Sequence, residues 1–340
     1  MSAGTATGEE TEARSTNDPV AQPGIPDLAW DSRLLALGGH FLQSRAWARC
    51  QVRMGSTIFH CSDGDWMWMA LIRQVGPFRR LYMPYGPQVA GTHALARSLR
   101  PAARLAREAR CAFVQFEPGA RHALDPGSVG ARRVRTRQPE HTWILRIDVD
   151  ESTLRSLQTK GHRSSINAAE RKGITFERTT SPVDVDHFLE LLHETNARTQ
   201  MPIYQDSYYR AIADELLPTG EAKLYCAWHA GRVVAAAIVM DFGDTRYYAY
   251  AASSSDPEAR RLSPAAPLVW HAILDARADG KAWFDFWGVA PPDQPDHAWS
   301  GFTQFKRSFG GELLSRAGTW DLPVRPWTYR AWSAAQRLRR

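Results

Sequence analysis

The first half of the chain alternates between helical and strand-like spacing of its apolar residues. Residues 41–55 carry apolar side chains at helical spacing up to Gly55. The segments STIFHC and WMWMALIRQ alternate with period two on either side of the turn SDGD, which predicts a strand pair. Residues 93–110 predict a helix rich in Ala and Arg, and CAFVQFEPG and HTWILRIDV predict strands. Together these elements predict a first lobe over residues 27–148.

The second half begins with helices and continues with a meander of strands. ESTLRSLQTKGHRSSINAAERKGI predicts two helical pieces broken near Gly161, and SPVDVDHFLELLHETNAR predicts a longer helix. AKLYCAWH, VVAAAIVMDF and TRYYAYAAS are three strands at hairpin spacing. A helix ending at Gly280, the strand AWFDFWG and the segment GFTQFKRSFGG follow. The predicted fold class is α+β, with a second lobe over residues 149–319.

Composition and charge limit the classes of ligand and the cellular location expected for the protein. The chain has 340 residues and a formal net charge of +6, which favours a polyanionic ligand. Four cysteines form no CxxC pair, so neither a metal site nor a disulfide framework is predicted, and a cytoplasmic location fits best. Residues 1–26 lack an apolar core and predict a disordered tail, and no apolar run is long enough to span a membrane.

The order of strands, helix and strand in the second half matches the core of GNAT acyltransferases, although the pattern alone fits many α+β folds. An acetyl-CoA enzyme needs free backbone N–H groups in the loop before the helix, where they cradle the pyrophosphate. The corresponding stretch SSSDPEARRLSPAAP contains no Gly and includes prolines, which lack an N–H. We therefore expect no acetyl-CoA and no other cofactor.

Several motifs occur in the order typical of one family. These are FLQSRAW, LYMPYGP, KGHRSSINAAERKGI, ETNAR, SPAAPLVWHAI, FDFWGV and GFTQFKRSFGG, which span Phe41 to about Leu322. In this order they resemble the Fem-type peptidyltransferases, aminoacyl-tRNA-dependent enzymes of the GNAT-like superfamily. The resemblance implies two tandem GNAT-like subdomains, the first completed by residues 320–340. The chain has no room for the long helical arm of some members, so it resembles the short, monomeric FemX type.

The resemblance implies transfer of an amino acid from aminoacyl-tRNA, as co-substrate, to an amine acceptor with formation of an amide. A peptidoglycan precursor, UDP-linked or lipid-linked, is the leading acceptor. The same chemistry on a small molecule or a peptide antibiotic intermediate is a second possibility. A catalytically silent protein that binds tRNA or a cell-wall precursor is a third, from a different functional class.

Two residues are predicted to act in catalysis. Ester aminolysis needs positive charge at the developing oxyanion, and the resemblance assigns that role to Lys306, with Phe305 stacking near the terminal adenosine. Spacing alone would make Lys306 a solvated lysine beside a core aromatic residue. Glu117 either orients the attacking amine or caps the end of a strand.

The resemblance also implies binding residues for both substrates. Many relatives have a lysine where this chain has Gln51, with Arg49 and Arg53 as possible substitutes, which weakens the case for a nucleotide-linked acceptor. The spacing alone would make the tyrosines half-buried and the basic residues solvated. The residues predicted to bind the acceptor are Gln51, Arg198, Tyr204 and Tyr250. Those predicted to bind tRNA are Lys160, Arg163 and Arg307, with Arg171 and Lys172 on the same basic face.

Overall fold

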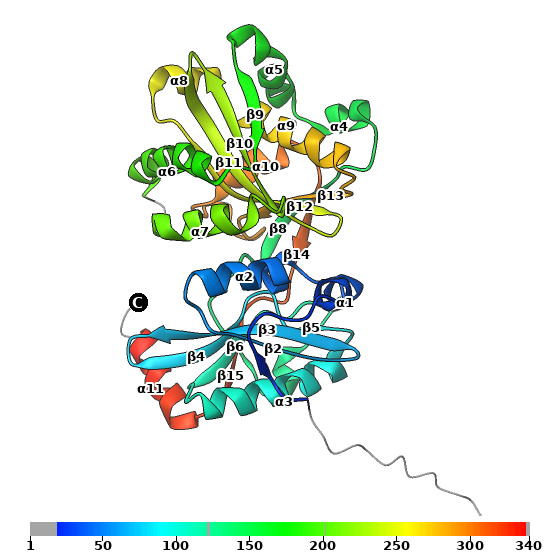
Figure 1. The fold of residues 1–340 in the computed structure, drawn as a ribbon, viewed down its shortest axis with the longest axis vertical. Helices are drawn as coiled ribbons and strands as arrows, with labels where there is room; N and C mark the ends of the chain where they lie inside the picture. The colour runs from blue at the N-terminus through cyan, green and yellow to red at the C-terminus, as the bar shows by residue number, and fades with distance from the viewer. Residues whose placement is uncertain (1–18, 121–122, 201, 338–340) are drawn as a thin grey trace, which may run out of the picture.

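The computed structural model describes residues 19–120, 123–200 and 202–337, which form two lobes, each built around one mixed β-sheet (Figure 1). In the first sheet the strand order is β1-β2-β3-β4-β6-β15-β7, and β5 pairs with β3. Its strands are β1 (Gln22–Pro23), β2 (Ile58–Asp63), β3 (Trp66–Val75), β4 (Phe78–Met83), β5 (Gln88–Val89), β6 (Phe113–Phe116), β7 (Arg132–Arg133) and β15 (Trp320–Pro323).

The second sheet has the strand order β14-β8-β13-β12-β11-β10-β9. Strands β12 and β13 pair in parallel, and the other neighbours are antiparallel. Its strands are β8 (His141–Arg146), β9 (Thr175–Thr179), β10 (Ala222–His229), β11 (Arg232–Phe242), β12 (Thr245–Ser253), β13 (Trp283–Gly288) and β14 (Glu312–Ser315).

Helices cover both faces of each sheet and bury apolar side chains of its central strands (Figure 1). The first lobe carries α1 (Trp30–Ala36), the 3₁₀ turn η1 (Phe41–Gln43), α2 (Arg45–Arg53), α3 (Thr92–Glu108), η2 (Pro126–Val129) and α11 (Pro326–Arg337). The second lobe carries α4 (Glu151–Leu157), α5 (Lys160–Ala168), η3 (Glu170–Lys172), η4 (Pro182–Asp184), α6 (Val185–Thr199), α7 (Asp206–Leu216), α8 (Pro257–Leu262), α9 (Ala265–Ala278) and α10 (Ser300–Arg307). Within the described ranges, no helix is long and apolar enough to cross a membrane.

The predicted α+β class and both hairpin patterns are confirmed, while three details differ. The helix expected over residues 41–55 is interrupted at Ser44, whose extended backbone and hydroxyl cap α2 by accepting from the Trp47 N–H. The break expected near Gly161 lies at Gln158 and Thr159 instead, and Gly161 is inside α5. The strand β8, expected in the first lobe, pairs with β13 and β14 of the second sheet. Because β13 and β14 are distant from β8 in the sequence, no pattern around β8 itself indicates which sheet it joins.

The two lobes share one hydrophobic core. Trp30, Phe41 and Met69 of the first lobe belong to the same buried cluster as Phe188 and Ile238 of the second. Helix α2 lies between the two sheets (Figure 1), and its buried residues are Ala46, Trp47, Ala48, Cys50 and Gln51. Of these, Ala46, Trp47, Ala48 and Cys50 belong to the buried cluster that contains residues of both lobes, so the lobes form a joint interior.

Ion pairs reinforce the contact between α2 and the second lobe. Arg49 Nε donates to Glu215 Oε1 at 2.8 Å and its Nη2 pairs with Glu221, and Arg53 Nη2 lies 2.7 Å from Asp214 Oδ2. Both arginines, considered from the sequence as substitutes for a phosphate-binding lysine, are therefore committed to the contact between lobes.

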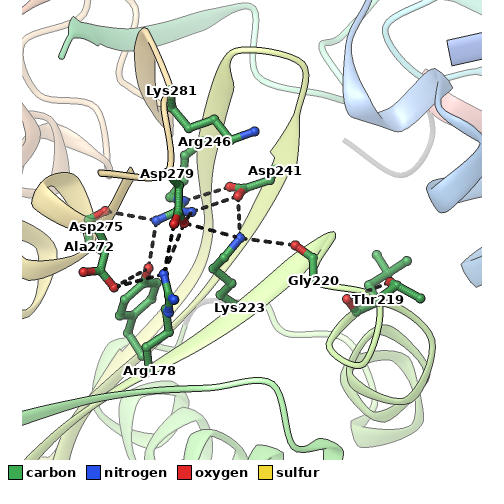
Figure 2. Close-up of polar contacts among 12 residues, drawn as sticks. Arg178, Thr219, Gly220, Lys223, Asp241, Arg246, Ala272, Asp275, Asp279 and Lys281 are labelled. Atoms are coloured by element: carbon green, nitrogen blue, oxygen red, sulfur yellow. Dashed lines mark hydrogen bonds and ion pairs between the residues drawn. The ribbon is translucent and has the colours of Figure 1, made fainter. Parts of the chain in front are cut away.

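A buried charge network fastens the second sheet to α9 (Figure 2). Arg246 is completely buried, and its Nε donates to Asp241 Oδ1 at 2.7 Å while its Nη2 donates to Asp279 Oδ2 at 2.6 Å. Lys223 Nζ donates to Asp241 Oδ2 at 2.6 Å. Burial acts to raise the pKa of Asp241, but hydrogen bonds from Arg246 and Lys223 hold that pKa below its usual value. The open depression beside this network is lined by paired charges, so we interpret it as structural.

Replacing Asp241 by Ala should destabilise the protein by about 3–5 kcal/mol, because it leaves the buried Arg246 guanidinium short of one carboxylate. Asp27→Ala is the matched control, since it removes an exposed ion pair with Arg33, and it should cost less than about 1 kcal/mol. Urea unfolding measures both free energies. Equal losses for the two variants would show that burial does not govern the network.

Candidate functional site

The Lys306 side chain lies on α10 and reaches toward the end of β13. Its Nζ donates to the Gly288 carbonyl at 2.6 Å. Burial lowers the pKa of Lys306 to about 8, although the charge of Asp285 acts in the opposite direction. The side chain of this lysine is therefore partly buried, and its ammonium donates to one backbone carbonyl.

An irregularity in β13 shapes this contact. Pairing with β8 shifts register between Asp285 and Gly288, and Trp287 has a positive φ of 68°. The Trp287 N–H donates to Asp285 Oδ1 at 2.7 Å, which stabilises the bulge. An added Cβ at Gly288 would lie 2.7 Å from Pro139 Cγ, so a side chain there would collide. The bulge thus aims the Gly288 carbonyl at Lys306.

A second cation, Arg316, lies near Asp285. Its Nη2 is 3.8 Å from Asp285 Oδ2, and its guanidinium carbon is 4.6 Å from the centre of the Tyr85 ring. Asp285 is buried, which raises its pKa, while the Arg316 charge acts to lower it. Two cations, Arg316 and Lys306, thus act on one buried carboxylate, which leaves a net positive charge in a partly desolvated place.

Glu117 is buried and accepts four hydrogen bonds. Tyr82 Oη and the Tyr85 N–H donate to Oε2 at 3.1 and 3.2 Å, and the Gln138 N–H and Thr319 Oγ1 donate to Oε1, both at 2.7 Å. Burial raises the pKa of Glu117, and these donors oppose the rise. Four donors occupy both oxygens, so this geometry favours a role in holding the segment around Gln138 in place.

That segment connects Glu117 to Lys306. Pro139 follows Gln138, packs against Gly288, and accepts a 2.7 Å hydrogen bond from Tyr85 Oη through its carbonyl. The two residues predicted to be catalytic therefore lie at the two ends of one chain of contacts. Tyr85, Arg316 and Glu117 line a narrow crevice at this point.

The residues predicted to bind tRNA gather where α5 meets α10. The Thr159 N–H donates to the Ser308 carbonyl at 2.9 Å, which places Lys160 beside the end of α10. Arg307 stacks over Trp143, with 5.3 Å from its guanidinium carbon to the ring centre. Phe305 packs edge-on against Phe309 and beside His162, so it is only partly available for stacking.

Arg163 and Lys172 are used within the fold. Arg163 Nη1 donates to the carbonyls of Arg155, Ser156 and Gln158, with the shortest distance 2.7 Å to Gln158, and so caps the end of α4. Lys172 Nζ donates to the Leu262 carbonyl at 3.1 Å. Lys160 remains exposed.

The residues predicted to bind the acceptor lie on α2 (Gln51), α6 (Arg198), β12 (Tyr250) and the loop before α7 (Tyr204). Tyr204 is 56% exposed and stacks on Tyr208 with ring centres 4.1 Å apart, and Tyr208 Oη lies 2.6 Å from Tyr250 Oη. Arg198, exposed at the end of α6, donates through Nε to Ser255 Oγ at 3.3 Å. Gln51 is buried, and its role is set by a residue that sequence reasoning missed.

That residue is Arg73 on β3, whose Nη2 donates to Gln51 Oε1 at 2.6 Å. Sequence reasoning also missed His40, whose ring lies 4.4 Å from that of Tyr85 and 5.3 Å from that of Trp287. Burial holds the pKa of His40 well below its usual value, and its Nε2 has no partner. No local pattern marks either residue. Among the described residues, no cluster of His, Cys, Asp or Glu is arranged to hold a metal ion.

Comparisons with known proteins agree with this architecture. The model of the Acetyltransferase (GNAT) domain matches residues 156–307. The crystal structure of FemX superimposes with a TM-score of 0.78 at 19% identity, covering 91% of this chain and 99% of that one. No curated protein sequence matches the chain.

Two further structures share the fold at lower similarity. The structure of L-PGS from Bacillus licheniformis has a TM-score of 0.58 at 14% identity and covers 93% of this chain and 98% of that one. The C-terminal domain of a putative lysylphosphatidylglycerol synthetase from Agrobacterium fabrum has a TM-score of 0.55 at 14% identity, with coverages of 86% and 92%. The chain thus shares the two-lobed fold of the FemX structure, and residues 156–307 are similar to the GNAT acetyltransferase domain.

Proposed function

We propose that this protein transfers an aminoacyl group from aminoacyl-tRNA to an amine acceptor. The observation that carries the proposal is the Lys306 ammonium in a FemX-like fold, held by the Gly288 carbonyl and partly removed from water. A cation in such a place stabilises charge that develops in a transition state more strongly than a solvated lysine does.

The proposed reaction is aminolysis of an ester. The acceptor amine forms a C–N bond with the aminoacyl carbonyl, whose oxygen becomes an oxyanion. The C–O bond to the tRNA 3′-oxygen then breaks, and the proton lost by the amine is balanced by the proton gained by that oxygen. Lys306 supplies positive charge to the oxyanion and to the leaving oxygen, with Arg316 adding to the local field. Positioning of two substrates supplies the rest.

The proposed binding of the donor, aminoacyl-tRNA, is supported by the basic residues around α10. Lys160 and Arg307 flank the end of this helix and carry charge suited to a phosphate backbone. Phe305, one residue before Lys306, lies at the same helix end. The tRNA acceptor end would therefore approach Lys306 along α10.

For the acceptor, we propose a peptidoglycan precursor, with Arg198, Tyr204 and Tyr250 as binding residues. Tyr204 offers an exposed ring on the stacked Tyr208. A small-molecule amine or a peptide intermediate is the second candidate, favoured by Gln51, which brings no charge to its position. A protein that only binds tRNA or a precursor would have no need for a desolvated Lys306.

Incubation with a mixture of charged tRNAs and candidate acceptors should yield an amide product that gains one residue mass, detected by mass spectrometry. Lys306→Met should slow single-turnover transfer by roughly 100- to 1,000-fold, because it deletes the ammonium and keeps the apolar stem. Lys306→Arg should recover part of the rate. Lys281→Met is the matched control, since Lys281 also donates to a glycine carbonyl, that of Gly243, away from this site.

The control variant should transfer like the unaltered protein, and melting curves check that both methionine variants are folded. Transfer at the normal rate by well-folded Lys306→Met protein would show that this lysine is structural. Absence of any product with every charged tRNA would remove the proposed function.

The pH dependence separates two roles for Lys306. Since its pKa is lowered to about 8, the ammonium is lost as pH rises through about 8, and transfer should fall over that range. The Lys306→Arg variant stays charged and should lack this fall. Single-turnover rates between pH 6.5 and 9.5, corrected for ester hydrolysis, measure the effect. A rate that rises through pH 8 would instead indicate a neutral lysine acting as a base.

Glu117→Gln should destabilise the protein by about 2–3 kcal/mol, because the amide nitrogen would face donors rather than accept from them. If the role of Glu117 is structural, transfer at low temperature, where the variant stays folded, should fall less than about tenfold. Thermal unfolding and single-turnover transfer are measured together. A loss of rate above 100-fold in folded protein would assign Glu117 to the orientation of the attacking amine.

A further inference from the structure

Helix α11 (Pro326–Arg337) packs on the first sheet by one side only. Tyr329 and Trp332 on this side are buried, with their ring centres 5.3 and 5.5 Å from that of Phe113 on β6. Val114, the next residue of β6, belongs instead to the buried cluster that α3 joins. Because consecutive residues of a strand project to opposite faces of a sheet, α11 and α3 cover opposite faces.

The other side of α11 is exposed and combines apolar with basic residues. Trp327 is 79% exposed, and the guanidinium carbon of Arg330 lies 4.8 Å from the centre of its ring. Ala331, Ala334 and Arg337 are exposed at helical spacing from Trp327, so they lie along the same side. This side of the helix therefore presents an aromatic ring, small apolar residues and positive charge together.

The positive charge around Trp327 is not compensated by acidic groups. The sequence from Leu322 to Arg340 contains no Asp or Glu. Strand β7 adds a further exposed cation that flanks the helix, since the guanidinium carbon of Arg132 lies 5.7 Å from the centre of the Tyr329 ring. Within residues 19–120, 123–200 and 202–337, four arginines at this place take part in no ion pair: Arg132, Arg325, Arg330 and Arg337.

This combination fits the interface between water and a lipid bilayer. A tryptophan ring left in water loses the free energy that contact with apolar groups would provide, and exposed apolar side chains rimmed by polar ones mark interaction surfaces. Tryptophan rings lie at the level of the lipid headgroups, and basic side chains beside them are attracted to anionic lipids. With 12 residues, α11 is too short to span a bilayer, so it would lie in the plane of its surface.

The composition of the exposed side favours a bilayer over tRNA, the other polyanion considered for this protein. A nucleic-acid backbone is bound by donors along its path, and the side chains of Ala331 and Ala334 have none. Small apolar residues between basic ones instead suit contact with lipid headgroups and the first acyl carbons. The basic residues proposed for tRNA also flank α10 in the second lobe, whereas α11 lies on the first lobe (Figure 1).

We propose that the exposed side of α11 docks the protein on the surface of an anionic lipid bilayer. The Trp327 ring enters the headgroup region, and the four unpaired arginines around it face lipid phosphates. One ring and four cations give reversible binding that weakens as salt screens the charges. Use of this surface to reach a lipid-linked acceptor rests on the proposed function, whereas the surface itself rests on α11.

Co-sedimentation of the full chain with vesicles tests the surface. The protein should bind vesicles of phosphatidylcholine that contain roughly one-third phosphatidylglycerol, bind pure phosphatidylcholine far more weakly, and lose affinity as salt is raised. Trp327→Ala should weaken binding to the anionic vesicles about tenfold, because the ring no longer leaves water. Arg330→Gln should weaken it about fivefold, because one cation is removed.

Two substitutions on other surfaces are the matched controls. Leu28→Ala removes an apolar side chain that is 83% exposed, in the segment before α1. Arg100→Gln removes one positive charge from the exposed side of α3, on the opposite face of the first sheet. Both variants should bind vesicles like the unaltered protein. Equal losses in the controls, or no binding to anionic vesicles by the unaltered protein, would overturn the proposal.

Other roles of the surface give different results. Trp327→Ala should melt at nearly the temperature of the unaltered protein, since the ring is exposed; a marked fall would assign Trp327 to structure and overturn the proposal. Its affinity for charged tRNA, measured by filter binding, should stay within about twofold. A loss of tRNA binding that parallels the loss of vesicle binding would assign the surface to RNA instead. Self-association that Trp327→Ala abolishes, measured by ultracentrifugation, would assign it to a second copy of the chain.

Transfer assays separate this surface from the proposed function. Trp327→Ala should transfer to a soluble acceptor at the normal rate, because α11 lies apart from Lys306. Vesicle binding without transfer to any acceptor would keep the surface and remove the proposed function. Transfer by a protein that does not bind anionic vesicles would do the reverse.

Discussion

The packing of α2 between two sheets is the constraint on which the rest of the structure depends. Cys50 and Trp47 on this helix are buried, and Gln51 on the same helix reaches back to Arg73 of the first sheet. Each lobe contributes side chains to one hydrophobic interior, and the ion pairs of Arg49 and Arg53 anchor the helix to the second lobe. Because such an interior is close-packed, the junction between the lobes has a fixed shape in which groups from both can act together.

Charge is distributed very differently in the interior and at this junction. In the second lobe, Arg246 meets Asp241 and Asp279 with short hydrogen bonds, which compensates its burial. Around Asp285 and on β3, cations outnumber acidic groups: the charges of Lys306 and Arg316 both act on Asp285, and among the described residues Arg73 donates to the neutral oxygens of Gln51 and Ser56. Uncompensated charge costs stability, and functional sites are the places where proteins retain it.

The regions proposed for the two substrates lie on different elements. Lys306 lies on α10, beside the basic surface proposed for the donor, and Tyr204, proposed for the acceptor, stacks on Tyr208 in the second lobe. The segment of Gln138 and Pro139 is held by Glu117 and packs on Gly288, whose carbonyl accepts from Lys306. Glu117 and Lys306 therefore share one framework.

Sequence patterns alone predicted most of the local elements and a set of candidate site residues. Period-two alternation specified β2–β3 and β10–β12, and the ordered motifs pointed to tandem GNAT lobes and to Lys306, because these signals depend on neighbours along the chain. The pairing of β8 with the second sheet, the ion pairs of Arg49 with acidic residues, and the hydrogen bond from Arg73 to Gln51 follow from the tertiary structure alone. Those depend on contacts between residues distant in sequence, and no local pattern encodes which distant side chain will be the partner.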